Sequence, residues 1–391
     1  MQSFTLGAAA SHRHPVGMAW SRAYDLARDT PRPLPAEPAE VNSALGRVLA
    51  EPVCAAVPVP AFDCAAMDGY AVAGPGPWTV IGRVLAGAAG PGELAAGTGV
   101  EIGTGAPVPD GAEAVLPYED CRREGAIVTG RLGPRSHIRR VGEDGPAGDL
   151  VVPAGRTVTA TVAAAAVQAG VEQVLAYRRP TVTLLVTGDE VITAGLPGPG
   201  QVRDSFTGLV GAVTSRAGGE LTERRHLRDD AALLRDALDA GTDVIVVSGS
   251  SSRGAADHLH AVLEERRATW HVRGVACRPG HPQGLAELPD GRWVVSLPGN
   301  PYAGLVAALT LLEPLLHTLG GRVTGPLPRR PVTGAARLMR DGVRVVPVLW
   351  DGRIVGGSGA AGLRAAAAAD ALAVLPAGWI DGDAAVTLAL P

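Results

Sequence analysis

The chain has 391 residues, a hydrophobic fraction of 46% and a formal net charge of −4. This length is enough for roughly two to four domains with sizeable cores. The negative charge and the lack of basic runs argue against a nucleic-acid-binding surface. All 35 basic residues are Arg, so every fixed cationic contact to a ligand must come from a guanidinium group.

The cysteines and the apolar runs indicate in which cellular compartment the protein is found. Cys54, Cys64, Cys121 and Cys277 show no CxxC spacing, which argues against a zinc site or a disulfide framework. No charged segment followed by an apolar core opens the chain, and apolar runs such as residues 305–312 are too short to cross a bilayer. We therefore expect a cytoplasmic protein without a membrane partner.

The first half of the chain changes character twice. Helical spacing predicts helices at residues 20–28 and 41–49. From Val53 to about Ile138, short strands between Gly and Pro turns indicate a β-rich unit. Residues 151–174 return to an Ala-rich helical pattern. If this segment packs beside the first helices, the β-rich unit is an insertion between two halves of one domain.

The second half alternates strands with helices. This pattern predicts a parallel, doubly wound α/β sheet covered on both faces, with ligands beyond the carboxyl ends of its strands. After Gly320, a Pro-rich linker and more short strands predict a small β-barrel or sandwich. The expected strands are residues 181–186, 220–225, 244–247, 270–277, 293–297, 343–350, 352–357, 371–378 and 384–390, and the expected helices are residues 206–217, 231–240, 302–319 and 365–369.

The stretch DVIVVSGSSSRGAAD, residues 243–257, combines an apolar strand, a loop of small residues and a helix start. The backbone N–H groups, hydroxyls and helix N-terminus of such a loop can face an anion. Asp257 would then lie where a carboxylate can hold a cation bound to that anion. An ordinary tight strand–helix connection explains the same residues equally well.

Other strand ends also carry polar residues. Asp189 and Glu190 follow an apolar strand, and they are either solvated turn residues or oxygen ligands for Mg²⁺. Helix capping alone explains Asp230. In the turn LPGNP, Pro301 suits the first position of a helix.

Three further stretches stand out. The loop RPGHP places Arg278 and His281 beside stiff backbone. In PAFDCAAMDGY, Asp68 with Gly69 is compatible with a simple hairpin turn. The stretch GTGAPVP, which includes Thr104, is also more specific than a generic turn.

The ordered motifs FDCAAMDGYAV, IGTGAPVPDGAEAV, GEDGPAGD, TGDEV, VRDS, SGSSSRGAAD, RPGHP and SLPGNP resemble those of the molybdopterin molybdenumtransferase family, the MoeA-like proteins that include the gephyrin E domain. The resemblance extends over nearly the whole chain from about Trp20. It implies a multidomain α/β plus β fold: an elongated domain, an inserted β domain, a doubly wound MoaB/Mog-like α/β domain and a C-terminal β-barrel-like domain. The expected boundaries are 16–50 with 140–178, 51–139, 179–322 and 323–391.

The resemblance also implies a reaction, in which molybdate and adenylated molybdopterin give molybdenum cofactor and AMP with Mg²⁺ assistance. It implies a homodimer, whose active site lies between the α/β domain of one subunit and the β domain of the other. Molybdopterin adenylyltransferase and the recipient molybdoenzymes are the expected protein partners.

The family's active-site residues map onto this chain position by position. Glu190 and Asp257 are the implied metal ligands. The implied catalytic residues are Asp68, Thr104, Asp144, Glu190, Asp230 and Asp257, and the implied substrate-binding residues are Ser248, Gly249, Ser252, Gly254, Arg278, His281, Pro298 and Pro301.

Four positions depart from the family pattern, and they leave alternatives open. They are Cys64, Phe206, Ser250 and His281. Phe206 replaces an amide, and His281 is mostly neutral at pH 7 unless a bound dianion raises its pKa. The alternatives are a catalytically impaired paralogue that binds a pterin, a nucleotide or a partner protein, and a molybdopterin adenylyltransferase. The flanking domains and the MDGY motif argue against the adenylyltransferase.

Overall fold

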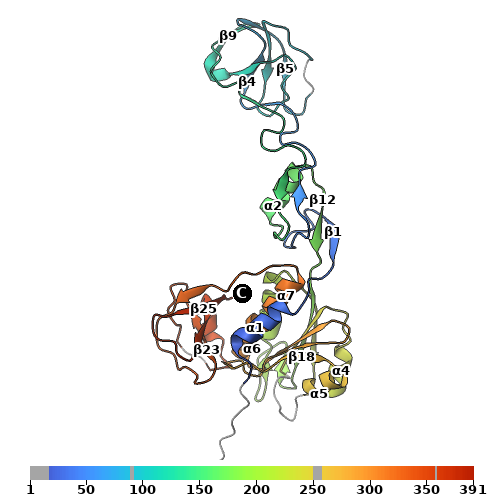
Figure 1. The fold of residues 1–391 in the computed structure, drawn as a ribbon, viewed down its shortest axis with the longest axis vertical. Helices are drawn as coiled ribbons and strands as arrows, with labels where there is room; N and C mark the ends of the chain where they lie inside the picture. The colour runs from blue at the N-terminus through green and yellow to red at the C-terminus, as the bar shows by residue number, and fades with distance from the viewer. Residues whose placement is uncertain (1–16, 89–91, 250–257, 357–358) are drawn as a thin grey trace, which may run out of the picture. The chain divides into compact units, whose positions relative to one another are not determined.

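The computed structural model describes residues 17–88, 92–249, 258–356 and 359–391 (Figure 1). The chain forms two compact units. The large unit combines the N-terminal residues up to Glu37 with Tyr177–Pro391, and the small unit is Pro38–Ala176. The four predicted domain boundaries remain predictions.

The small unit contains the predicted β-rich region. A six-stranded sheet has the order β7-β4-β6-β5-β9-β8, in which β5 and β6 are parallel and the other neighbours are antiparallel. Separate apolar clusters around Val100 and Leu116 contribute to its core. The strands are β4 (Gly69–Val72), β5 (Trp78–Val84), β6 (Thr98–Ile102), β7 (Ala114–Pro117), β8 (Cys121–Glu124) and β9 (Ile127–Gly130), with the short 3₁₀ helix η1 at Tyr118–Asp120.

The rest of the small unit corrects two helix predictions. Residues 41–46 form turns, because Gly46 has a φ of 81° and donates its N–H to the Val158 carbonyl (2.8 Å), and Val48 and Leu49 make isolated β-bridges. In residues 151–174, only α2 (Ala160–Gln168) is helical, capped by the Thr159 hydroxyl. Residues 41–49 and 151–174 share one core, as expected, whereas residues 20–28 pack in the core of the large unit instead. Short strands pair as β1 (Ala36–Glu40) with β12 (Gln173–Tyr177), β2 (Val53–Cys54) with β11 (Leu150–Val152), and β3 (Cys64–Ala65) with β10 (Ile138–Arg139).

The large unit is built on a second six-stranded sheet, with the order β16-β13-β17-β21-β20-β18. Its first four strands are parallel, and helices pack on both faces, which confirms the doubly wound α/β prediction. The alternation along β17 shows this directly, since Val246 faces one core and Val247 the other. The elements are β13 (Thr181–Thr187), β16 (Glu220–Leu227), β17 (Val244–Ser248), β18 (Thr269–Arg273), β20 (Gly284–Glu287), β21 (Trp293–Leu297), α3 (Phe206–Arg216), α4 (Ala231–Ala237) and α5 (Leu259–Glu265).

The expectation of an all-parallel sheet was wrong at one edge. β20 and β18 are antiparallel to their neighbours. A tight turn at Gly291 (φ 87°) joins β20 directly to β21, which leaves no room for a crossover helix. The predicted strand at residues 270–277 is also divided. Gly274 (φ 85°) turns the chain, so that β18 and β19 (Cys277–Arg278) belong to different sheets.

One long apolar helix crosses the core of the large unit. It consists of α6 (Pro301–Ala307), the π-helical η2 (Ala308–Leu312) and α7 (Glu313–Leu319). Pro314 has no N–H for the carbonyl four residues earlier, which accounts for the widened turn. The helix is long and apolar enough to cross a membrane, but 83% of its most apolar window is buried, as in a core helix. α1 (Trp20–Asp29) lies against it (Figure 1). The Trp20 indole N–H donates to the Thr310 hydroxyl (3.0 Å).

The C-terminal strands form a five-stranded sheet with the order β19-β23-β24-β25-β22. The strands expected near residues 343, 371 and 384 are present, and so is a short helix, α8 (Arg364–Ala367). The expected strand at residues 352–357 was wrong, because only isolated bridges form at Arg353 and Ile354. Closure into a barrel remains a prediction. The remaining strands are β22 (Arg329–Pro331), β23 (Val343–Val348), β24 (Ala371–Pro376) and β25 (Ala384–Ala389).

Candidate functional site

The carboxyl ends of β13, β17 and β21 meet at a cavity of about 540 Å³ in the large unit. Thr187, Ser248 and Pro298 are the strand-end residues that line it. Other walls come from Glu190, from the start of α3 and from the start of α6. The described lining also includes Val202, Arg203, Pro282 and Ala361. Parallel strands bring these loops to one edge, which is where a ligand site was expected.

The strand ends are packed so closely that only small residues fit. The Thr187 hydroxyl donates to the Ser248 carbonyl (2.8 Å). Gly249 has a φ of 99°, and a Cβ there would lie 2.6 Å from the Thr187 carbonyl oxygen. A Cβ on Gly299 would lie 3.3 Å from the Gly249 Cα. The loop therefore requires glycine for both conformation and space.

Glu190 presents a free carboxylate to the cavity. Within the described residues, its side chain makes no hydrogen bond or ion pair. Its backbone is held by a short parallel pair of strands, β14 (Val191–Ile192) and β15 (Val202–Arg203), next to which the Val202 N–H donates to the Glu190 carbonyl (2.9 Å). The Arg203 guanidinium donates to the carbonyls of Thr193 (3.2 Å) and Gly195, which ties down the loop that connects the two strands.

The helix starts bring hydroxyl and amide groups to the cavity. Ser205 precedes α3 and Asn300 precedes α6, and neither side chain caps its helix. Asp204 caps α3 instead, accepting from the N–H groups of Phe206 (2.8 Å) and Thr207 (3.2 Å). Pro301 occupies the first position of α6, as predicted. Ser205 and Asn300 therefore remain available as donors.

Phe206, one of the four departures, forms an apolar wall. Its ring is 6% exposed and lies over α6, where a Cβ on Gly304 would be 2.2 Å from the ring Cε1 atom. The cavity thus combines this apolar wall with the carboxylate of Glu190.

The other predicted residues of the large unit lie in separate surroundings. Asp230 caps α4, and hydrogen bonds from the N–H groups of Leu233 and Ala232 lower the pKa of its carboxyl. Arg278 is exposed on β19, in register with Arg344 on β23. His281 donates from Nδ1 to the Val275 carbonyl (2.9 Å). None of the three lines the cavity, although Pro282 does. Ser250, Ser252, Gly254 and Asp257 lie outside the described residues.

In the small unit, two predicted residues that are far apart in sequence come together. The Asp68 Oδ1 atom accepts hydrogen bonds from the Thr104 N–H (2.6 Å) and hydroxyl (2.9 Å). These two bonds lower the pKa of the Asp68 carboxyl. Asp144 instead pairs with Arg139, and the departure Cys64 is buried in β3. Asp68 therefore stays ionised, with its second oxygen open to solvent.

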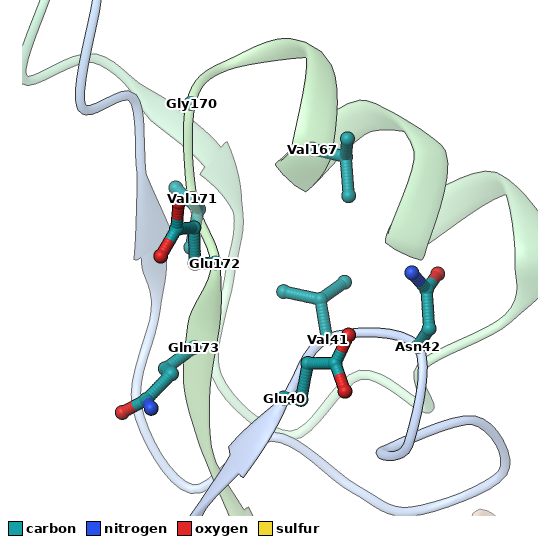
Figure 2. Close-up of a pocket in the computed structure, with 8 residues that line it drawn as sticks. All are labelled: Glu40, Val41, Asn42, Val167, Gly170, Val171, Glu172 and Gln173. Carbon is teal, nitrogen blue, oxygen red and sulfur yellow. The ribbon is translucent and has the colours of Figure 1, made fainter.

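A cavity of about 500 Å³ in the small unit was not predicted from the sequence (Figure 2). Val41 and Val167 extend into it from opposite sides, and Glu40 and Glu172 are the charged residues that line it. Among its described lining residues there is no cationic side chain. Two carboxylates without a compensating cation disfavour an oxyanion, so the strand-end cavity is the better candidate site.

The sequence analysis did not assign Ser205 or Asn300 a role. Both are exposed to the cavity only because α3 and α6 begin there. Their signal was the position of a Ser or Asn directly before a predicted helix, which ordinary capping explains equally well.

The described part of the chain contains no group of three or more His, Cys, Asp and Glu side chains that could hold a metal ion. The donor set nevertheless fits Mg²⁺, because this ion commonly takes only one or two carboxylates and completes its shell with water and substrate phosphates. Glu190 provides one such carboxylate at an open cavity.

Two family models match the chain. Residues 18–170 match the MoeA N-terminal region (domain I and II), and residues 183–318 match the probable molybdopterin binding domain. The chain is 33% identical over 306 residues to a molybdopterin molybdenumtransferase of Haemophilus influenzae, with 75% of each chain covered. It is 32% identical over 365 residues to one of Nostoc sp., covering 86% of this chain and 84% of the relative.

Among solved structures, a molybdopterin biosynthesis MoeA protein from Pyrococcus horikosii superposes with a TM-score of 0.77 at 27% identity. This match covers 96% of the present chain and 99% of the other. Sequence and structure therefore agree over almost the full length, and the chain belongs to the molybdopterin molybdenumtransferase family.

Proposed function

We propose that this protein is a molybdopterin molybdenumtransferase, which inserts molybdate into adenylated molybdopterin and releases AMP in a Mg²⁺-dependent reaction. The observation that carries the proposal is the strand-end cavity. In a chain of this family, it combines the free carboxylate of Glu190 with small-residue turns and with hydroxyl and amide donors.

The residues of the cavity suit an anionic substrate. Gly249 and Gly299 let a bulky group approach the backbone closely. Ser205 and Asn300 supply donors for phosphate or molybdate oxygens. The apolar face of Phe206 suits a flat ring system better than a charged group. Binding and orientation are therefore the tasks of these side chains.

Glu190, with Asp257 as the second ligand implied by the resemblance, would hold Mg²⁺. When bound, the ion would neutralise charge on the phosphoanhydride oxygens. The parallel pair of β14 and β15 keeps the Glu190 backbone in place, which limits the reorganisation that this residue needs on binding.

The proposal includes a homodimer in which Asp68, Thr104 and Asp144 of one subunit complete the cavity of the other. The hydrogen bonds from Thr104 fix the Asp68 carboxylate in one orientation, which supports a positioning role. Adenylated molybdopterin would come from a molybdopterin adenylyltransferase and the product would pass to molybdoenzymes, all in the cytoplasm.

The direct test supplies purified protein with adenylated molybdopterin, molybdate and Mg²⁺, and measures AMP and molybdenum cofactor. Both products should appear in equal amounts and depend on Mg²⁺. Tight substrate binding without AMP release would instead support the impaired paralogue. Co-expression of Glu190→Gln and Asp68→Asn subunits tests the shared site, because each mixed dimer would have one unaltered site and should therefore exceed the activity of either variant alone.

A further inference from the structure

A second cavity in the large unit, of about 420 Å³, opens at the C-terminal sheet. Val345, Val346 and Ile354 contribute its walls. Tyr302 also lines it, and its hydroxyl donates to the Val345 carbonyl (3.2 Å). Among the residues that the structure describes, the cavity shares no lining residue with the strand-end cavity, although Tyr302 directly follows Pro301. It is therefore a separate space.

Two arginines are the charged residues that line this second cavity. Arg344 is half-buried on β23, and Arg337 is exposed. Within the described ranges, neither forms an ion pair and no acidic side chain lines the cavity. The neighbouring strand adds Arg278, in register with Arg344, rather than an acid.

Neither arginine of this cavity has a counter-charge among the described residues, whereas Arg353, close in sequence, pairs with Asp351 (2.7 Å). Two guanidinium groups around one space create a local positive field that favours a dianion.

The apolar walls of this cavity restrict which dianions can bind there. Ala335, Ala336, Val346, Pro347 and Ile354 give the cavity an apolar lining. A site for inorganic phosphate alone would need polar groups on most sides, and these walls would leave some of its oxygens without partners. The volume falls in the range of small-ligand sites, which are mostly apolar with a few placed polar groups.

We propose that this cavity binds a phosphate monoester carried on a compact apolar body, with Arg337 and Arg344 holding the phosphate. The apolar body lies against Val346, Pro347 and Ile354. The site is independent of the proposed transferase reaction, because its residues and its cavity are separate from those around Glu190.

Methyl NMR on the full-length protein tests the proposal, with phenyl phosphate as the probe. Ile354 lines the cavity, while Val191 lines the strand-end cavity, so their methyl groups report on the two sites separately. Phenyl phosphate should shift the Ile354 methyl signal in a saturable way. Three related compounds should bind more weakly at Ile354. Inorganic phosphate lacks the apolar body, benzoate lacks the second negative charge, and benzyl alcohol lacks all charge.

The double variant Arg337→Gln/Arg344→Gln should weaken binding at Ile354 by about tenfold or more. Its response at Val191 should stay as in the wild type. Arg340→Gln is the matched control, because Arg340 is an exposed residue of the same segment that does not line the cavity. An Ile354 signal that does not saturate, or an equal loss in Arg340→Gln, would overturn the proposal.

Discussion

The strand-end cavity of the large unit and the cavity of the small unit in Figure 2 have similar volumes, about 540 and 500 Å³. Their chemistry differs. The first places one free carboxylate among glycine turns, hydroxyls and an amide, and the second places two carboxylates beside valines. Volume alone therefore does not identify the site. The site is identified by its chemistry, because its residues can bind an oxyanion together with the cation that accompanies it.

Replacing Gly249 in the strand-end loop should have the largest effect on the transferase rate. Gly249→Ala puts a methyl group 2.6 Å from the Thr187 carbonyl oxygen at a φ of 99°, so the loop must move. We expect the transferase rate to fall by about 100-fold or more, as measured by AMP release.

Gly170→Ala provides the control in the other cavity. Gly170 also has a positive φ (77°), and its Cβ would lie 3.0 Å from Val57. This variant should lose stability, by about 1–3 kcal/mol, but keep its transferase rate. Equal loss of rate in both variants would mean that Gly249 acts only through folding.

Removing one negative charge from each cavity sharpens the same comparison. Glu190→Gln should lower the rate by about 100-fold with little change in Tm, because it removes the free carboxylate that faces the substrate. Glu172→Gln, in the small-unit cavity, should leave both unchanged. The Mg²⁺ concentration for half-maximal rate should rise only in Glu190→Gln.

The small unit should contribute through Asp68 rather than through its cavity. Asp68→Asn and Thr104→Val should each lower the rate by about tenfold, with little loss of stability because Asp68 is exposed. The double variant should be no worse than the more severe single variant, since Thr104 acts by orienting Asp68. Additive losses would contradict this coupling.

The smallest effect concerns the stability of the large unit. Burial lowers the pKa of His317 to about 4, and the positive charges of Arg322 and Arg216 act in the same direction. In the unfolded chain the same side chain binds a proton near pH 6.5, so protonation favours the unfolded state. Stability should therefore fall as the pH drops from about 6.5 towards 4, by at most about 3 kcal/mol. Burial raises the pKa of Glu313, which opposes this loss at acidic pH. Urea unfolding of the wild type and of His317→Gln tests this prediction, because the free energy of unfolding of the variant should depend less on pH.

The sequence predicted elements whose signal is local. The β-branched runs of β13 and β17 indicated buried strands, and the polar residues after them indicated a site. Long-range effects were missed. Residues 41–49 have helical spacing, but Gly46 bonds to Val158 instead. The hairpin at Gly291 similarly broke the expected alternation of strands and helices.

The candidate site was predictable only in part, for the same reason. Resemblance singled out Asp68 and Thr104, but no local pattern shows that residues 36 positions apart share two hydrogen bonds. Ser205 and Asn300 face a cavity only once α3 and α6 are packed. Local spacing therefore predicts the strands and their ends, whereas the walls of the cavity depend on tertiary packing.

The contact between Phe206 and Gly304 limits how this protein can be engineered. The ring fills the space that the missing side chain of Gly304 leaves on α6. Restoring an amide by Phe206→Asn would therefore empty a ring-sized volume in the core, and losing a buried Phe side chain costs about 3–5 kcal/mol. A second substitution, Gly304→Ala, is sterically possible only without the ring and would fill part of this volume with one methyl group. The two positions are therefore coupled, and a variant at one of them should be tested together with a variant at the other.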